Sequence, residues 1–512
     1  MRFRILLGLV TGATLLVSAQ STRLPAGSRS LSLRECFDLA LSRNLDLRIQ
    51  HLTTDIAGYS LSSSWSPYEP LFSFGARHDY VSQPGDFDPQ KFNPDFPYVM
   101  QNDTLGPALT GKAPIGLSYA FNAFTREDNA RTDFTSDAGD AANFPGGIRS
   151  TNNYFSSVGV TLQQHLLKDF WIDADRELIQ VRRKEVSMSK QALRFQVMKT
   201  MLAVELGYYD LVAAREYVQV QEKACELRRQ FVAETRRRVE VGDLPPLDTE
   251  QAETQLQNSL TALAAAREAL AARQNALKGL LTDNFRDWVD LEVEPSEALV
   301  AVPAAINRAE SFQRALTERP DLIEARLAVE RSDVTVKFRL NQLFPSLDFV
   351  GRYGGLGVDP EPGNSINNAI SFRNQEYSYG VVLSVPLSNV GERGYYHASK
   401  ASKQITELQL QKAEQDVLLQ IADYLSRVET RFSQVGSTRK ARMYAESALE
   451  AEVKKLANGF STSFVVLELQ EILTAARTAE VQALADYNKN LAQLAFAEGN
   501  TLERNHITLD VK

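Results

Sequence analysis

The sequence predicts a mixed α and β membrane protein, in which four strands per chain join those of two further copies in a trimeric twelve-stranded β-barrel. A long α-helical coiled-coil tunnel would continue this barrel. Three observations lead to the prediction: the chain contains an internal duplication, each half carries two strand-like segments, and each half contains two very long helices.

The duplication appears as pairs of matching segments, which are 275 residues apart in the early part of each half. Ala40-Leu41 recurs as Ala315-Leu316, and Pro70 recurs as Pro345, both 275 residues further on. The spacing falls to 221 between Gly159 and Gly380, so the first half carries a 54-residue longer insert. The predicted organisation is a signal peptide (1–19), a first repeat (20–282), a linker (283–318), a second repeat (319–498) and a C-terminal tail (499–512).

Strands are predicted where residues alternate and where β-branched and aromatic side chains gather. The four segments are 71–81, 156–162, 346–353 and 377–385. Segments rich in Pro, Gly, Asn and Asp, at 83–113 and 357–376, favour loops. Within the enlarged loop 83–153, Ile115 to Phe124 also alternates and fits one strand of a further hairpin, which the sequence leaves open.

The helices are predicted as two long hairpins, at 174–282 and 391–498. From Ala174 to Val241 there is no proline and only one glycine, Gly207. Apolar residues such as Met188, Ala192 and Phe195 follow spacings of four and three, which is the coiled-coil repeat.

Four strands cannot close a barrel, because about eight are needed and an open edge in lipid leaves backbone groups without partners. Three chains with four strands each give twelve. The N-terminus supports an envelope location, because Arg2 and Arg4 precede an apolar stretch that ends at Val17-Ser18-Ala19, a pattern typical of a cleaved signal peptide. No later apolar stretch is long enough for a spanning helix.

Composition argues against several other functions. A net charge of −8 disfavours nucleic acid as the main partner. Two cysteines and five scattered histidines leave little material for a disulfide framework or a metal site. Gly106 to Ala113 resembles a phosphate-binding loop but has Ala113 where a hydroxyl is needed, so we interpret it as a chance match. No catalytic residue, cofactor or metal is therefore expected, and the chain is not predicted to be an enzyme.

Both hairpin turns contain glycine followed by apolar residues. Gly242 and Gly459 can end a helix in the left-handed conformation. That role does not explain apolar residues such as Leu244 and Phe460 at a tip surrounded by water. A docking surface and a turn packed on its neighbour both fit this pattern.

The duplicated pattern resembles the TolC-like outer-membrane efflux protein family, the outer membrane factors. The residues that carry the resemblance are Leu31-Ser32-Leu33 through Asn44-Leu45-Asp46-Leu47, Arg319-Pro320-Asp321-Leu322, Gly242 with Asp248, and Gly459 with Leu467. The resemblance implies a homotrimer in the cell outer membrane with a periplasmic helical extension. Segment 283–318 and the C-terminal tail would form an equatorial belt around the helices.

The same resemblance implies a passive export duct of a tripartite efflux or type I secretion system. A periplasmic adaptor (membrane fusion protein), an inner-membrane transporter and outer-membrane lipid would be its partners. The adaptor would contact the tips at Gly242, Leu244, Pro245, Gly459 and Ser463.

Asp248 and Glu468 would form a periplasmic gate near the three-fold axis, where like charges repel. An ordinary first-turn acid offsetting the helix dipole explains Asp248 equally well. Leu456, Ser461 and Val465 depart from the family pattern at the second tip. Arg236, Arg237 or Arg238 would then have to act as the gate's basic partner. The alternative to a channel is a secreted or periplasmic coiled-coil structural or interaction protein.

Overall fold

The computed structural model describes residues 27–83, 86–88, 93–95, 98–133, 147–304 and 307–507. The predicted signal peptide (1–19), parts of the loop 83–153 and the end of the tail 499–512 lie outside these residues. The chain divides into two compact units, and each draws on both predicted repeats. Unit 1 combines 1–48, 196–311 and 420–508; unit 2 combines 49–195, 312–419 and 509–512.

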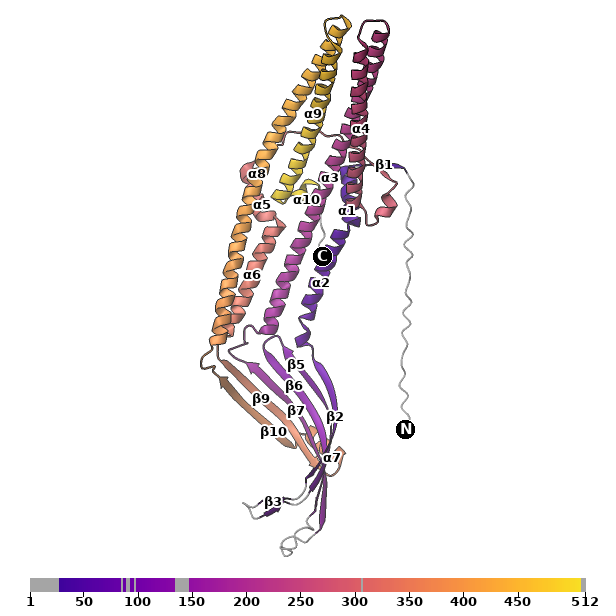
Figure 1. Ribbon diagram of the computed structural model, residues 1–512. Helices are drawn as coiled ribbons and strands as arrows, with labels where there is room; N and C mark the ends of the chain where they lie inside the picture. The colour runs from indigo at the N-terminus through magenta and orange to yellow at the C-terminus, as the bar shows by residue number, and fades with distance from the viewer. Residues whose placement is uncertain are drawn as a thin grey trace. The chain divides into compact units, whose positions relative to one another are not determined.

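Unit 2 contains a six-stranded sheet in which every pair of neighbours is antiparallel. Figure 1 shows the strands side by side in the order β10-β9-β7-β6-β5-β2. The strands are β2 (Leu71–Gln83), β5 (Tyr98–Ala113), β6 (Leu117–Asp133), β7 (Ile148–His165), β9 (Ser346–Asp359) and β10 (Asn374–Ser384). A separate pair joins β3 (Asp86–Asp88) to β4 (Asn93–Asp95).

The prediction of four strands per chain is wrong, because the sheet has six. Three of the predicted segments lie within β2, β7 and β9, the fourth extends one residue beyond the end of β10, and Ile115 to Phe124 overlaps β6. The missed strand, β5, falls in a segment predicted to be a loop. Its Gly106-Pro107 step has low strand propensity. Pairing with β2 on one side and β6 on the other overrides that local preference.

A short helix, α7 (Pro362–Ile370), lies in the second segment predicted as a loop. The other helices with residues in unit 2 are α2 (Leu45–Ser63), the 3-10 helix η1 (Ser66–Tyr68), α5 (Arg308–Glu318), α6 (Pro320–Asn341) and the first parts of α3 and α8.

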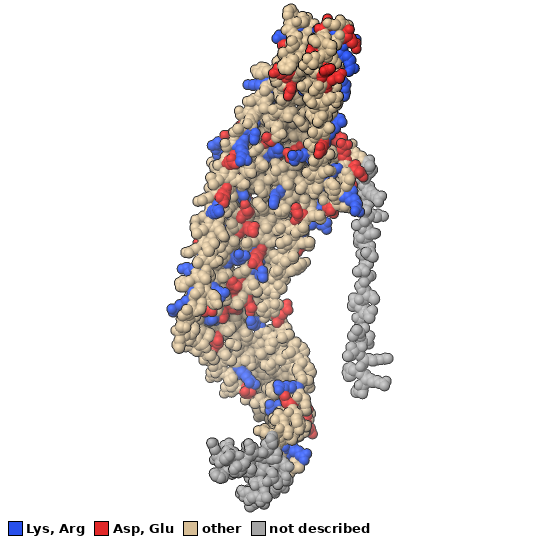
Figure 2. Space-filling model, viewed as in Figure 1, with Lys and Arg blue, Asp and Glu red and all other residues tan. Residues whose placement is uncertain are grey.

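The two long hairpins match each other in the lengths of their corresponding helices. The first consists of α3 (Ala174–Glu240) and α4 (Pro246–Leu281), with 67 and 36 residues. The second consists of α8 (Val390–Ala457) and α9 (Ser463–Glu498), with 68 and 36 residues. Acidic and basic side chains are interspersed over the helices in Figure 2. Within the described residues, no helix combines the length and apolar character needed to cross a membrane.

Unit 1 has its own core beside a small parallel pair, β1 (Ser28–Leu31) with β8 (Glu292–Pro295). Tyr208 and Trp288 are fully buried there. The Tyr208 hydroxyl donates to the Leu31 carbonyl at 3.2 Å and accepts from the Glu297 amide at 3.2 Å. These bonds tie the N-terminal segment and segment 283–318 to α3. The remaining elements are α1 (Leu33–Arg43), the 3-10 helix η2 (Phe285–Trp288) and α10 (Thr501–Arg504).

Candidate functional site

One face of the sheet is apolar and lies open. Alternate residues of each strand share a face, and the strand register aligns the apolar ones across all six strands. Most are exposed; Tyr379, for example, is 78% exposed. We call this the apolar face: Phe72, Phe74, Leu105, Leu109, Phe121, Val158, Val160, Leu162, Tyr353, Tyr377, Tyr379, Val381 and Leu383.

Charged groups on the apolar face are confined to the end away from the strand-to-helix connections, where His78, Asp103 and Glu127 lie. His78 Nδ1 is 2.6 Å from the Asp103 carboxylate. From Phe72 to Ala76, and across the register partners of those residues, the face carries no Asp, Glu, Lys or Arg in the described strands. An uncharged exposed band between polar ends is the pattern of a membrane-facing sheet.

The opposite face of the sheet is polar. Its ion pairs include Arg77–Asp79 at 2.7 Å and Arg126–Asp128 at 2.6 Å. A third pair crosses between neighbouring strands, where Arg352 Nη2 is 3.3 Å from Glu376 Oε2. We call this the polar face. The two faces of the sheet therefore differ strongly in polarity.

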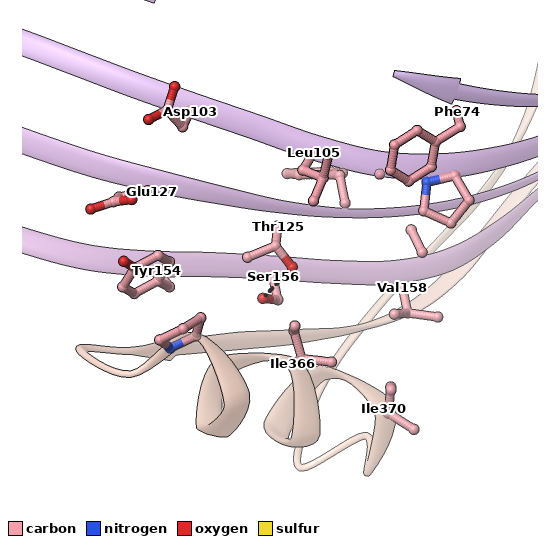
Figure 3. A pocket seen from close by; sticks show the side chains of 15 residues that line it. Phe74, Asp103, Leu105, Thr125, Glu127, Tyr154, Ser156, Val158, Ile366 and Ile370 are labelled. Carbon is pink, nitrogen blue, oxygen red and sulfur yellow. Dashed lines mark hydrogen bonds between the residues drawn. The ribbon is translucent and has the colours of Figure 1, made fainter. Parts of the chain in front are cut away.

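Helix α7 lies against the apolar face, where two glycines permit its close approach (Figure 3). A Cβ on Gly357 would lie 1.9 Å from the Ser365 carbonyl oxygen, and one on Gly355 would lie 2.1 Å from that of Ala369. The buried Ser365 hydroxyl is 2.8 Å from the Tyr154 carbonyl oxygen and 2.9 Å from Ser156 Oγ. A groove remains between α7 and the strands, lined by Phe74, Leu105, Val158, Ile366 and Ile370 among others.

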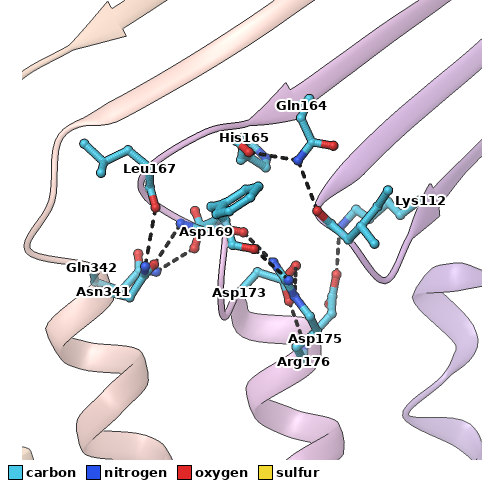
Figure 4. A network of polar contacts seen from close by, with 12 residues as sticks. Lys112, Gln164, His165, Leu167, Asp169, Asp173, Asp175, Arg176, Asn341 and Gln342 are labelled. Carbon is cyan, nitrogen blue, oxygen red and sulfur yellow. Dashed lines mark hydrogen bonds and ion pairs between the residues drawn. The ribbon is translucent and has the colours of Figure 1, made fainter.

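Polar contacts fix the end of the sheet from which the helices continue (Figure 4). Arg176, in the first turn of α3, donates to the Asp173 carboxylate and to the carbonyls of Asp169 and Phe170. Lys112 Nζ of β5 lies 2.9 Å from Asp175 Oδ2. These bonds join the sheet to the start of α3.

Residues that follow β7 are also bonded to the end of α6. The Asp169 amide donates to Asn341 Oδ1 at 2.7 Å, and Gln342 Nε2 donates to Asp169 Oδ1 at 2.6 Å. Two segments far apart in the sequence are thereby held together at the base of the sheet.

Both hairpin tips in unit 1 use the same cap. Gly242 has φ +84° and Gly459 has φ +78°, which favours glycine. The Asp243 amide donates to the Arg238 carbonyl at 2.9 Å, and the Phe460 amide donates to the Lys455 carbonyl at 2.9 Å. These 6→1 bonds define a Schellman cap at each tip.

The tips expose apolar side chains, as one of the two interpretations of the turns predicted. Phe460 is 84% exposed and Phe464 65% exposed at the second tip. Pro245 is exposed and Leu244 half-buried at the first tip. Ser463, by contrast, is only 2% exposed, so in the isolated chain its side chain does not reach the tip surface.

The predicted gate acids lie near the starts of the returning helices. Asp248 is half-buried in the first turn of α4, and Glu468 is exposed on α9. Neither carboxylate forms an ion pair in the part of the chain that the structure describes. Arg236 pairs with Glu253 at 2.6 Å instead of Asp248.

Two of the three departures at the second tip, Leu456 and Ser461, have structural explanations. Leu456 is buried in a cluster with Leu449, Val466 and Leu473. Its carbonyl oxygen lies 3.4 Å from Arg238 Nη1, which links the two tips. Ser461 Oγ donates to the Glu452 carboxylate at 2.6 Å, and Val465 is half-buried.

Sequence reasoning missed two polar contacts within the sheet. His78 and His165 each contact an aspartate across a strand pair, His165 Nδ1 lying 2.6 Å from Asp348 Oδ1. These partners lie far away in sequence, so only the strand register reveals them. The match at Gly106 to Ala113 lies within β5, not between a strand and a helix. In the described chain, no group of three or more His, Cys, Asp or Glu could hold a metal ion.

The fold is similar to that of a solved outer-membrane channel. A crystal structure of the Campylobacter jejuni CmeC outer membrane channel superposes with a TM-score of 0.64 at 15% identity, over 92% of this chain and 86% of that one. At this identity the likeness describes the fold alone.

Sequence comparisons agree with the resemblance that the residues indicate. Residues 312–500 match the family model described as outer membrane efflux protein. The outer membrane efflux protein BepC of Brucella suis is 24% identical over 338 residues, 64% of this chain and 69% of BepC. The alkaline protease secretion protein AprF of Pseudomonas aeruginosa is 26% identical over 386 residues, 69% of this chain and 72% of AprF. The predicted resemblance to TolC-like outer membrane efflux proteins is thereby confirmed.

Proposed function

We propose that this chain is the outer-membrane channel of a tripartite efflux or type I secretion system, and that it acts as a passive export duct. The observation that carries the proposal is the sheet, in which one face carries an uncharged, exposed apolar band and the other face carries ion pairs. The apolar face would contact lipid, and the polar face would line a water-filled pore. The efflux and secretion proteins similar to this chain support the same role.

The channel would be a homotrimer. One sheet cannot enclose a pore, and β2 and β10 each have a neighbour on one side only. Unpaired backbone groups in the hydrocarbon region cost several kcal/mol each, so the edges need partners from further copies. The long hairpins, whose surfaces carry mixed charges, would extend into the periplasm.

A periplasmic adaptor, itself coupled to an inner-membrane pump, would dock at the two tips. The exposed apolar residues Phe460 and Phe464, together with Leu244, Pro245 and the two capping glycines, offer an apolar surface at the ends of polar helices. Apolar groups rimmed by charge are typical of protein contact sites. Ser463 would take part only after a rearrangement that uncovers it.

A secreted coiled-coil interaction protein remains the competing function. It would explain the long hairpins, but it provides no reason for a six-stranded sheet whose apolar face is largely exposed. Fractionation separates the two: a channel is recovered with outer membranes, and a coiled-coil protein with the soluble periplasm.

The tips provide the functional test. Gly242→Leu and Gly459→Leu should each abolish export of a fluorescent efflux dye or of a secreted protein cargo, while the outer-membrane assembly persists. The control is Gly436→Leu, a bulky change at a glycine in α8 with open space around it. Normal export of both cargoes by both tip variants would contradict adaptor docking at the tips.

A further inference from the structure

The hairpin β5–β6 is a full part of the sheet and not a loop attached to its edge. β5 pairs with β2 along the whole of β2, from Leu71↔Thr110 to Gln83↔Tyr98. β6 pairs with β7 from Leu117↔Gln164 to Asp133↔Ile148. The added strands therefore separate β2 from β7 over their entire length.

Both added strands follow the two faces of the sheet. Leu105, Leu109 and Phe121 lie on the apolar face, and Arg126 and Asp128 lie on the polar face. A hairpin that projected into water would not need an uncharged face aligned with those of its neighbours. Its pattern is that of strands that cross the same membrane.

The turn of this hairpin is fixed at the base of the sheet (Figure 4). Gly116 adopts φ +79°, and its carbonyl accepts from the His165 amide at 3.4 Å. Gln164 Nε2 donates to the Ile115 carbonyl at 3.0 Å. With the Lys112–Asp175 ion pair, these bonds hold the hairpin beside the start of α3.

The two edges of the sheet suit a second copy of the same chain. Because all neighbours are antiparallel and the strands number six, β2 and β10 run in opposite directions. They have 13 and 11 residues, so β10 of one copy can pair antiparallel with β2 of the next along most of both strands. An insertion of two strands preserves this relation between the edges, whereas a single strand would reverse it.

We infer that three copies close a barrel of eighteen strands rather than twelve. This inference rests on the trimeric channel proposed above and concerns the width of its outer-membrane pore. With strands about 4.8 Å apart and tilted by about 40°, eighteen strands enclose a backbone cylinder about 36 Å across, against about 24 Å for twelve. A mouth of this width admits polypeptide-sized cargo, and size selection then falls to the helical part of the duct.

Paired cysteines distinguish the two barrels in native outer membranes. Phe72 is the register partner of Leu109, which pairs with Phe121, which in turn pairs with Val160. In the eighteen-stranded barrel, F72C/L109C should form a disulfide within the chain on oxidation, because directly opposed residues have Cβ atoms about 5 Å apart, and a small shift of the strands brings them to the distance of a disulfide. F72C/V160C should form none, because two strands separate these residues. A disulfide in F72C/V160C and none in F72C/L109C would overturn the inference.

A strand count by cryo-electron microscopy of the detergent-solubilised full chain gives the second readout. Eighteen strands are expected in the full-chain trimer, and twelve in a variant lacking residues 98–133. A full-chain trimer with twelve strands would overturn the inference while leaving the proposed channel intact. Recovery of the chain from the soluble periplasm would instead contradict the proposed function.

Discussion

The two halves of the chain are nearly equal in their helices and differ in their sheet. The hairpin arms have 67 and 36 residues in the first half and 68 and 36 in the second, and both tips end in the same cap. The first half, however, supplies four strands to the sheet and the second half two. An antiparallel sheet accepts an added hairpin, because the two new strands pair with each other and with a neighbour on each side.

The largest expected effect comes from placing a charge on the apolar face. Phe121→Arg in the first half and Tyr379→Arg in the second should each destabilise the membrane-inserted fold by about 2–4 kcal/mol, because a cation would face lipid. The matched controls Asn122→Arg and Ser378→Arg place the same charge on the polar face. Urea unfolding in vesicles measures the difference. Equal effects on both faces would contradict the assignment of the apolar face to lipid.

A smaller effect is expected where the second half packs α7 on the sheet. Gly357→Ala places a methyl group against the Ser365 carbonyl, so α7 must shift, at a cost of about 1–3 kcal/mol. Faster hydrogen exchange in residues 362–370 would report this shift. Gly363→Ala is the control, because no atom lies within 4 Å of its added Cβ. If exchange in that segment is unchanged in Gly357→Ala, α7 is not held by the close approach.

The gate acids offer a comparison of the two tips. At least one of the variants Asp248→Ala and Glu468→Ala should show a higher single-channel conductance in planar bilayers or a weaker preference for cations. Removal of carboxylates that repel their symmetry mates reduces the charge at the constriction. Glu250→Ala, in the same region of α4, serves as control. Unchanged conductance and selectivity in both variants would assign Asp248 to helix capping.

The smallest effect concerns a buried acid of α3 near the C-terminal helix. Burial raises the pKa of Glu205, while Arg504, 3.7 Å away, opposes the shift. Because the folded-state pKa is raised, the protonated form favours folding, and stability falls as pH rises from the ordinary carboxyl value of 4.5 through the raised value. Glu205→Gln should reduce that fall, measured as the difference in Tm between pH 5 and pH 8. An identical pH dependence in both proteins would contradict the role of burial.

The long helices could be predicted from sequence because their signal is local and repeated. Apolar residues recur at spacings of four and three over many turns. Gly242 and Gly459, which follow α3 and α8, each lie in a short turn between two helices. β5 gave no such signal: Asn102-Asp103, Gly106-Pro107 and Gly111 favour turns, and the strand exists because it has a neighbour on each side. Long-range pairing of this kind cannot be read from composition.

The tips were predicted in part. The capping roles of Gly242 and Gly459 follow from the conformational freedom of glycine, which the sequence states directly. The burial of Ser463 and the contact of Arg238 with the Leu456 carbonyl depend on how two hairpins pack, and no spacing reveals it. α7 was missed for a similar reason. Gly355 and Gly357 indicate a close approach of a helix to β9 only when the position of that helix is known.

The most direct test of the account is the mass of the detergent-solubilised protein measured by light scattering, with the detergent contribution subtracted. The two unpaired edges of the sheet predict a particle of about three times the mass of one chain, with strand content intact by circular dichroism. A monodisperse monomer that retains its strand content would contradict the account, because its sheet would then be stable with both edges open.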